Sequence, residues 1–331
     1  MCADGRVCDG ARSEYSTMPP PSGMAALQYM FDMRHTALGT LGLRPPLGPT
    51  HLQHKLALVT GGTGGIGLAA AQAMAAAGAT VHIVGRSAER GAAAVSSASG
   101  GPGKIIFHRC DLSTVAAARQ LDRQLEEDLN GGQLDVLVQN LACMPDKFEA
   151  VDGGHERTLS TNLLAFYRLG TALYPRMAKG GRVINVVSAG MHLHKLRVPD
   201  LRALSESADA FDPIRAYCIT HRARVLLTKR WAAEHPHLWF GSVHPGWVET
   251  DGLRGAAAMA GFYALMRRSL RTPEKGADSI AWLLAGGASD VPSGSYVWNR
   301  AERKVDLPLS GTKASEAEVD ELVEFVRSAT L

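Results

Sequence analysis

Eight consecutive residues, Thr60-Gly61-Gly62-Thr63-Gly64-Gly65-Ile66-Gly67, have the composition of a phosphate-binding loop. Glycine carries no Cβ, so Gly65 and Gly67 can let the backbone approach a pyrophosphate closely. The unpaired N–H groups at the start of a following helix, with its positive dipole end, would face the same anion. This chemistry needs a strand before the loop and a helix after it, so the neighbouring segments decide the interpretation.

Both neighbouring segments have the required patterns. Leu56-Ala57-Leu58-Val59 is a short apolar run typical of a buried strand. The alanine-rich segment 68–77 is typical of a helix that ends at Gly78. Strand, glycine turn and helix together predict a dinucleotide site rather than a flexible surface turn.

The residues after the next two strands indicate which dinucleotide is bound. Arg86 follows the strand expected at 80–84, where the adenosine ribose lies in folds of this kind. A guanidinium pairs with a 2′-phosphate, so Arg86 favours NADP(H) over NAD(H), with a solvated surface arginine as the alternative. Asp111 and Leu112 follow the next strand, where the Asp111 carboxylate could read the adenine edge. It could equally cap the next helix through Ser113, and both interpretations stay open.

Strands and helices alternate almost regularly along the chain. We expect strands at 56–59, 80–84, 104–108, 134–138, 182–187 and 239–243, and helices at 68–77, 88–97, 114–129, 162–177 and 216–233. Such alternation implies right-handed crossovers and a parallel sheet covered on both faces. The predicted fold is a single α/β domain, a doubly wound Rossmann sheet of about seven strands with helices on both faces.

Two further segments frame this domain. Residues 315–328 combine a capping box, Ser315 to Glu318, with an apolar stripe at Val319, Leu322, Val323 and Val326, which predicts a helix docked on the domain. Residues 1–50 are expected to be an extension before the main domain, 51–331. Its polar start, 1–23, is expected to be disordered, and 24–38 is expected to form a short helix that packs on the domain, with membrane attachment as the alternative.

Composition and charge exclude several classes of protein. The 331 residues are 46% hydrophobic and 20% charged, and 35 Lys and Arg against 32 Asp and Glu leave a net charge of +3. No basic block is present, so nucleic acid is not an expected partner. The longest apolar stretch, 256–266, is too short for a transmembrane segment. Five cysteines without metal-type spacing suit a reducing compartment, and neither disulfides nor a metal site is expected.

A cytoplasmic location is the expectation from these features. Three acidic residues among the first fourteen argue against an organelle transit peptide. Arginines and serines in the same stretch keep organelle targeting open as the alternative.

Over residues 54–300 the chain resembles the short-chain dehydrogenases/reductases, single-domain Rossmann oxidoreductases. Thr60 to Gly67 match the family pattern TGxxxGIG, and residues 245–250 match PGxxxT. Asp111 matches the family's adenine-contacting aspartate, and Asn162, Ser188 and Tyr217 fall in the order of its catalytic residues. Further residues, including Phe211-Asp212 and His244-Pro245-Gly246-Trp247, resemble one subgroup of the family.

The resemblance implies a reaction and a role for each residue. Hydride moves between NADP(H) and a carbonyl or alcohol carbon, while Tyr217 exchanges a proton with the substrate oxygen and Ser188 orients that oxygen. Asn162 would organise a water relay, and Thr250 would bond the nicotinamide carboxamide. A small-molecule partner is therefore expected, and homo-oligomers are common in the family. The implied cofactor site consists of Gly61, Thr63, Gly65, Ile66, Gly67, Arg86, Asp111, Leu112, Asn140, Ala142, Tyr217, His221, Val248 and Thr250.

The largest departure from the family is at position 221. The family pattern Tyr-x-x-x-Lys is here Tyr217-Cys218-Ile219-Thr220-His221, so His221 should point where the lysine ammonium belongs. Arg222 lies about 100° further round the helix and cannot simply substitute. With a reference pKa of about 6.5, His221 is mostly neutral at physiological pH and lowers the Tyr217 pKa poorly. A protonated tyrosine can still act as an acid, which favours slow carbonyl reduction over alcohol oxidation.

The second departure is Gln139-Asn140-Leu141-Ala142, where the family has Asn-Asn-Ala-Gly. The added carbon at Leu141 and Ala142 should narrow the cofactor groove.

Two segments, 189–216 and 253–270, are placed to cover a substrate, and their apolar residues favour a lipophilic carbonyl compound. The rival hypothesis is a noncatalytic NADP(H)-binding protein that acts as a sensor or scaffold. A third possibility is that the altered 139–142 segment has abolished cofactor binding.

Overall fold

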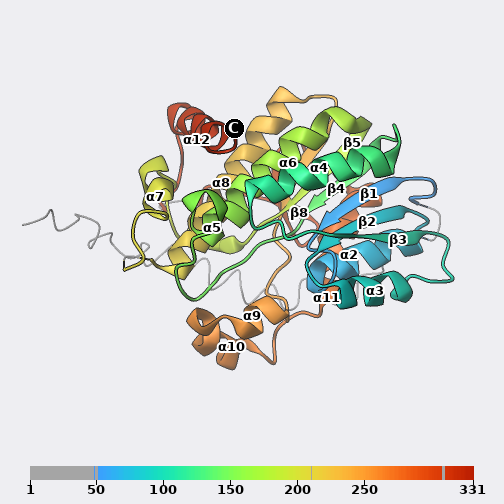
Figure 1. The fold of residues 1–331 in the computed structure, drawn as a ribbon, viewed down its shortest axis with the longest axis horizontal. Helices are drawn as coiled ribbons and strands as arrows, with labels where there is room; N and C mark the ends of the chain where they lie inside the picture. Colours follow the sequence, from blue (N-terminus) through green and yellow to red (C-terminus); the bar gives the residue numbers. More distant parts are fainter. Residues whose placement is uncertain (1–47, 49–50, 210, 308–309) are drawn as a thin grey trace, which may run out of the picture.

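One sheet of eight strands runs through the structure, and helices cover both of its faces (Figure 1). The computed structural model describes residues 48, 51–209, 211–307 and 310–331. The helix expected at 24–38 lies outside these residues. The strands are β1 (Leu56–Thr60), β2 (Thr80–Gly85), β3 (Lys104–Arg109), β4 (Leu134–Gln139), β5 (Met177–Val186), β6 (Trp239–Val243), β7 (Ser295–Trp298) and β8 (Ala301–Arg303).

The sheet has the order β3-β2-β1-β4-β5-β6-β7-β8, and all its neighbours are parallel except β7 and β8. The predicted doubly wound α/β sheet is thus confirmed, with one strand more than the expected seven. The extra strand β8 turns back from β7 through Asn299 and Arg300, which both have positive φ angles. A two-residue hairpin needs this left-handed backbone, and asparagine tolerates it well.

The helices divide between the two faces. In Figure 1, α2, α3 and α11 lie on one face, and α4, α6 and α8 lie on the other. Successive residues of β1 show why both faces are apolar: Leu58 packs into the core under α4, α6 and α8, whereas Ala57 and Val59 pack into the core under α2 and α11. These six helices are α2 (Gly65–Ala76), α3 (Ala88–Ser97), α4 (Val115–Leu129), α6 (Phe166–Leu173), α8 (Pro213–Glu234) and α11 (Pro273–Leu284).

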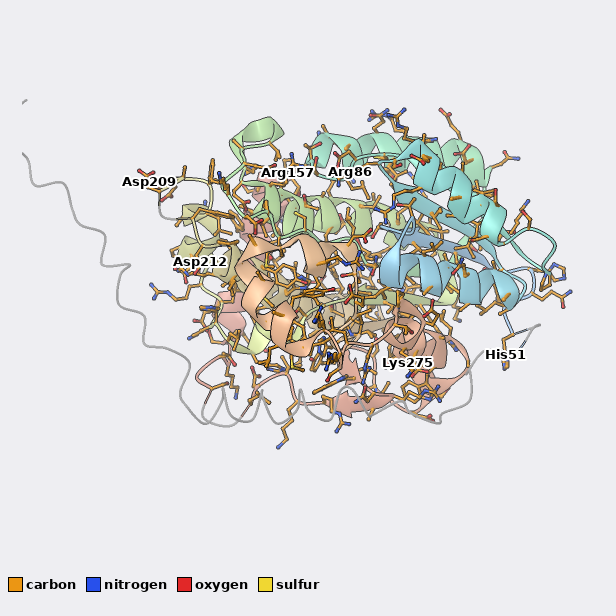
Figure 2. All side chains as sticks on the ribbon, turned by 90° about the horizontal axis from the view of Figure 1, so that it is seen from below. His51, Arg86, Arg157, Asp209, Asp212 and Lys275 are labelled. Atoms are coloured by element: carbon orange, nitrogen blue, oxygen red, sulfur yellow. The ribbon has the colours of Figure 1, made fainter. Side chains whose placement is uncertain are left out.

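The other helices are shorter or lie at the edge. They are α5 (Arg157–Leu159), α7 (Val198–Ala203), α9 (Asp251–Gly255), α10 (Ala260–Met266) and α12 (Glu316–Ala329). Short 3-10 turns occupy Asp152–Gly154, Tyr174–Arg176, Ala189–His192, Ala257–Met259 and Gly287–Ser289. The helices α9 and α10 project below the rest of the molecule in Figure 1 and lie in front of it in Figure 2.

The helix expected at 162–177 was wrong in its extent. The helical stretch begins at α5, passes through a π-helical turn at Ser160–Ala165, continues as α6 and ends in the 3-10 turn with Pro175. Proline removes a backbone N–H and fixes φ, so the α-helix cannot continue through it. Met177, expected to be helical, is instead the first residue of β5. The π-helical turn contains Asn162, and such turns are frequent at functional sites.

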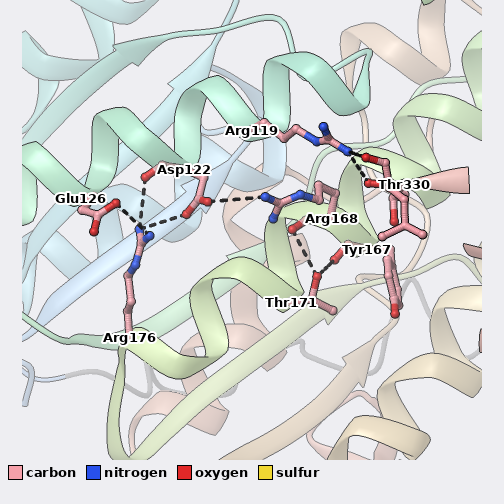
Figure 3. A network of polar contacts seen from close by, with 9 residues as sticks. Arg119, Asp122, Glu126, Tyr167, Arg168, Thr171, Arg176 and Thr330 are labelled. Carbon is pink, nitrogen blue, oxygen red and sulfur yellow. Dashed lines mark hydrogen bonds and ion pairs between the residues drawn. The ribbon is translucent and has the colours of Figure 1, made fainter. Parts of the chain in front are cut away.

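Polar contacts join α4 to α6 beneath the C-terminal helix (Figure 3). Asp122 on α4 pairs with Arg168 and Arg176, and Arg119 donates a hydrogen bond of 2.7 Å to the carbonyl of Thr330. The C-terminal helix α12 packs on the domain. Ser315 and Glu318 form the predicted capping box, and the apolar side of α12 buries Leu322, Phe325 and Val326.

Within the described residues, no helix combines the length and the apolar character that a membrane crossing requires.

Candidate active site

The glycine loop between β1 and α2 is shaped to accept an anion. Gly61 and Gly65 have φ angles of +65° and +53°, a left-handed backbone that favours glycine. A Cβ on Gly67 would lie 2.3 Å from the carbonyl oxygen of Gly61, so only glycine fits there. No side chain caps α2, which leaves its first N–H groups open to a phosphate. The backbone of this loop is therefore compatible with a bound phosphate, and the dinucleotide site stays a prediction.

Asn140, expected in the cofactor site, supports this loop from behind. Its Nδ2 donates to the carbonyl oxygens of Thr60 and Gly61 at 3.1 and 3.3 Å. The Thr60 hydroxyl accepts hydrogen bonds from the backbone N–H groups of Asn140 and Leu141. The carboxyl end of β4 is thus tied to the start of the loop. The Leu141 side chain lies beside Gly61, and the narrowing of the cofactor groove stays a prediction.

Arg86 lies at an open hollow between β2, β3 and α4. The hollow has a volume of about 470 Å³ and is lined by Arg86, Arg109, Asp111 and residues of α4. Figure 2 labels Arg86, whose side chain is 72% exposed and lies 4.0 Å from the Asp111 carboxylate. Thr114 caps α4, so the alternative that Asp111 is the helix cap is wrong. Arg109 was not predicted; it donates to the Arg86 carbonyl and brings a second guanidinium to the hollow.

The remaining predicted cofactor residues lie around the loop in different ways. Leu112 is buried in the core below the hollow. Ile66 and Val248 both pack beside Gly276 of α11. Thr250 caps α9 through its hydroxyl, and its methyl group lies beside Gly65. The loop of residues 245–250 is therefore seated on the glycine loop, and Thr63 lies across from Gly85 at the end of β2.

Tyr217, Ser188 and His221 come together at the carboxyl end of the sheet. Tyr217 and His221 are one turn apart on α8, and their ring centroids are 4.2 Å apart. Ser188 follows β5, and its side chain hydrogen bonds with Tyr217. The His221 Nδ1 accepts a hydrogen bond of 3.2 Å from the backbone N–H of Ser188. His221 therefore holds the strand end that carries Ser188.

Burial controls the ionisation of both rings. It raises the pKa of Tyr217 to about 12, although the charge of Arg224 and the hydrogen bond from Ser188 oppose the shift. Burial, together with the nearby Arg224 and His244, lowers the pKa of His221 well below its usual value. His221 is therefore neutral at physiological pH, as expected, and Tyr217 is a protonated phenol.

Asn162 lies beside this group in the π-helical turn. Its side chain accepts from the backbone N–H of Cys143 at 2.8 Å and donates to the Cys143 carbonyl at 2.9 Å. These two bonds fix the chain just after Ala142. The backbone carbonyl of Asn162 accepts a hydrogen bond from Arg224.

Two fully buried arginines on α8 point in different directions. Arg222 bonds the carbonyls of Val305 and Thr312 and pairs with Asp306, so it lies away from the site, as the sequence predicted. Arg224 lies under the site and was missed. The sequence feature that could have predicted it is its position seven residues after Tyr217, because this spacing places both residues on one face of a helix.

The two segments expected to cover a substrate differ in how deeply they are buried. In 189–216, Leu196, Val198 and Leu201 belong to the core, while the half-buried Phe211 packs against it and meets Phe148 edge to face. The segment 253–270 forms α9 and α10, in which no residue is fully buried within the helices and Leu265 is 82% exposed. Trp247, after β6, contacts Phe262 of α10 with the two rings tilted and their centroids 4.2 Å apart.

The chain is similar to several known proteins. Residues 55–197 match the short chain dehydrogenase family. The chain is 38% identical over 274 residues to dehydrogenase/reductase SDR family member 12 of Bos taurus, covering 81% of this chain and 84% of the relative. That protein represents the subgroup which the residues around Phe211 and His244 resemble. The chain is also 28% identical over 292 residues to polyprenol dehydrogenase of Mus musculus, covering 82% and 83% of the two chains.

Solved structures show the same fold. A short-chain dehydrogenase/reductase from Serratia marcescens has a TM-score of 0.60 and 26% sequence identity to this chain. The match covers 76% of this chain and 97% of the other.

Proposed function

This chain belongs to the short-chain dehydrogenase/reductase family, and on that premise we propose that it is an NADPH-dependent reductase of lipophilic carbonyl compounds. The observation that carries the proposal is the meeting of Tyr217 and Ser188 at the carboxyl end of the sheet. This is where open α/β sheets bind their ligands.

Each residue has a definite task in the reduction. NADPH supplies the hydride when it is bound. Tyr217 donates its proton to the carbonyl oxygen as negative charge develops there, and Ser188 holds that oxygen in place. Because the Tyr217 pKa is raised to about 12, the proton donor is fully loaded at neutral pH. Oxidation of an alcohol needs the phenolate, whose fraction falls tenfold for each pH unit below the pKa, so that reaction is expected to need alkaline solution.

NADPH is preferred over NADH because of the charges at the end of β2. Arg86 and Arg109 line the hollow next to the glycine loop, and the Arg86 guanidinium is exposed. Their positive charges favour a 2′-phosphate, whereas a free 2′-hydroxyl would favour an acidic residue.

A lipophilic substrate is supported by the projecting unit of α9 and α10. Its exposed face carries apolar residues such as Leu265, and the unit follows directly on the loop that contacts Gly65. Polyprenol dehydrogenase, to which the chain is similar, is named for a long isoprenoid alcohol.

Turnover with a panel of aldehydes and ketones tests the proposal. The wild type should oxidise NADPH in the presence of a lipophilic carbonyl compound, and Tyr217→Phe should lose at least about 100-fold in kcat because the proton donor is absent. NADPH affinity should stay close to that of the wild type. Equal turnover in Tyr217→Phe would exclude Tyr217 as the acid.

A second candidate function is cofactor sensing without catalysis. It is favoured by His221, a neutral residue at the position of the family's lysine. The variant His221→Lys separates the two functions. If activity appears only in His221→Lys, the natural protein is a binding protein; if the wild type already turns over, it is an enzyme. Unchanged NADPH fluorescence on titration would instead show that the 139–142 segment has abolished cofactor binding.

A further inference from the structure

A single buried cation lies at the point where three parts of the active site meet. Arg224 is 1% exposed, and its guanidinium donates to three backbone carbonyls. The acceptors are Leu141 after β4 at 2.6 Å, Asn162 in the π-helical turn at 2.5 Å, and Val186 at the end of β5 at 3.2 Å. Each of these segments carries a residue of the proposed site.

The geometry suits arginine and no other cation. A guanidinium offers five donors in a planar fork, so it can reach acceptors in different directions, whereas a lysine ammonium is one point charge. The guanidinium carbon lies 4.5 Å from the centre of the Phe166 ring, which adds a cation–π contact. A cavity beside Arg224 has a volume of only about 10 Å³, the space of about one water.

The charge of Arg224 is not neutralised by a carboxylate. Among the described residues, the groups whose charges act on it are Tyr217 and Cys143. A buried cation without a counter-ion is costly, and its field remains available to an anion that forms nearby. The groups that face Tyr217 are Arg224, Cys218 and His221 on its own helix, Ser188 after β5 and Cys143 after β4. Of these, only Arg224 is positively charged at neutral pH.

We propose that Arg224 is a positioning residue that replaces the missing lysine: it holds the ends of β4, β5 and the π-helical turn together, and its charge favours the anionic form of Tyr217. The inference rests on the proposed function. With His221 neutral, Arg224 is the charge that limits the rise in the Tyr217 pKa caused by burial. His221 keeps the structural task of holding Ser188, and Arg224 supplies the charge.

Three substitutions and one matched control separate positioning from charge. Arg224→Gln removes the charge, whereas Arg224→Lys keeps it, and both lose most of the carbonyl contacts. Arg222→Gln removes an equally buried arginine from the same helix, whose hydrogen bonds within the described part of the chain go to Val305, Asp306 and Thr312. Far-ultraviolet circular dichroism and thermal melting establish that each variant is folded.

The expected result is a difference between glutamine and lysine at position 224. Arg224→Gln should lose at least about tenfold in kcat for carbonyl reduction, with the substrate KM within about threefold, because a weaker acid transfers its proton more slowly. Arg224→Lys should recover most of the kcat. Arg222→Gln should keep the wild-type kcat. Equal kcat values for the two Arg224 variants, or an equal loss in Arg222→Gln, would overturn the proposal.

Binding of NADPH provides a second measurement that does not need turnover. Both Arg224 variants should bind NADPH about tenfold more weakly, because the end of β4 is no longer held by the Leu141 carbonyl. Wild-type affinity in both variants would overturn the positioning role. If the wild type itself turns over no carbonyl compound, the proposed function fails. The positioning role of Arg224 is then tested by the NADPH affinities of the two Arg224 variants alone. If Arg224→Gln does not fold, a tenfold loss of kcat in Arg224→Lys would overturn the role of the charge.

Discussion

The two halves of the site are built by different means. The cofactor half, from the glycine loop to Arg86, is formed largely by backbone between β1 and α2. Glycines in this loop carry no Cβ, and this lets the backbone take its tight shape. The catalytic half, around Tyr217, uses buried side chains that must hold strand ends in place. The cofactor half can therefore be predicted from a short sequence motif. The catalytic half depends on contacts between residues that are distant in sequence, such as Arg224 and Leu141.

The largest effect is expected from adding a single carbon to the cofactor half. In Gly67→Ala the new Cβ would lie 2.3 Å from the carbonyl oxygen of Gly61, so the loop backbone must move. We expect NADPH binding to weaken by at least about 100-fold and the protein to lose about 3 kcal/mol of stability. Fluorescence titration and urea unfolding measure both.

Gly64→Ala is the matched control. Its φ of −175° is extended backbone, and the nearest atom to a new Cβ is the end of the flexible Arg90 side chain. This variant should bind NADPH within about tenfold of the wild type. If both substitutions weaken NADPH binding equally, the backbone shape of the glycine loop does not determine cofactor binding.

Acid should weaken the sheet beneath the cofactor half. His82 on β2 and His108 on β3 are buried and their ring nitrogens lie 2.7 Å apart. Burial, with the neighbouring His108, lowers the pKa of His82 from 6.5 to about 4. The unfolded chain binds more protons between these values, so this stability is complete above pH 6.5 and is lost as the pH falls toward 4.

The size of that loss is on the order of 3 kcal/mol for His82 alone. His82→Leu should flatten the dependence of the unfolding free energy on pH between 6.5 and 4, measured by urea unfolding at several pH values. Buried His244 in the catalytic half also has a lowered pKa, of about 3, and remains in the variant. An unchanged slope in His82→Leu would mean that acid acts through the catalytic half instead.

Arg86→Gln should change the choice of cofactor without affecting catalysis. Loss of one charge-assisted contact to a 2′-phosphate should weaken NADPH binding by about 10- to 100-fold and leave NADH binding unchanged. Arg123→Gln removes an exposed charge from α4 and controls for net charge. If NADH binding falls equally, Arg86 does not recognise the 2′-phosphate.

The sequence predicted the sheet and the cofactor half because both depend on local patterns. Apolar runs mark β1 to β6, and the glycine spacing marks the loop. The short pair β7 and β8 and the π-helical turn at Asn162 were missed, since tertiary contacts stabilise them. Arg224 was missed for the same physical reason: its partners are backbone carbonyls 38 to 83 residues away, which no local pattern contains.

The smallest effect concerns Arg90, which local patterns also failed to predict. It lies beside Gly64 at the glycine loop, where it pairs with Asp251 of α9 at 2.6 Å. Both side chains are exposed, so the pair itself adds little stability. Asp251→Asn frees the guanidinium toward the bound pyrophosphate and should tighten NADPH binding about twofold to threefold at low salt. The gain should vanish at high salt and in Arg90→Gln/Asp251→Asn; weaker binding in Asp251→Asn would show that the pair instead holds α9 over the cofactor half.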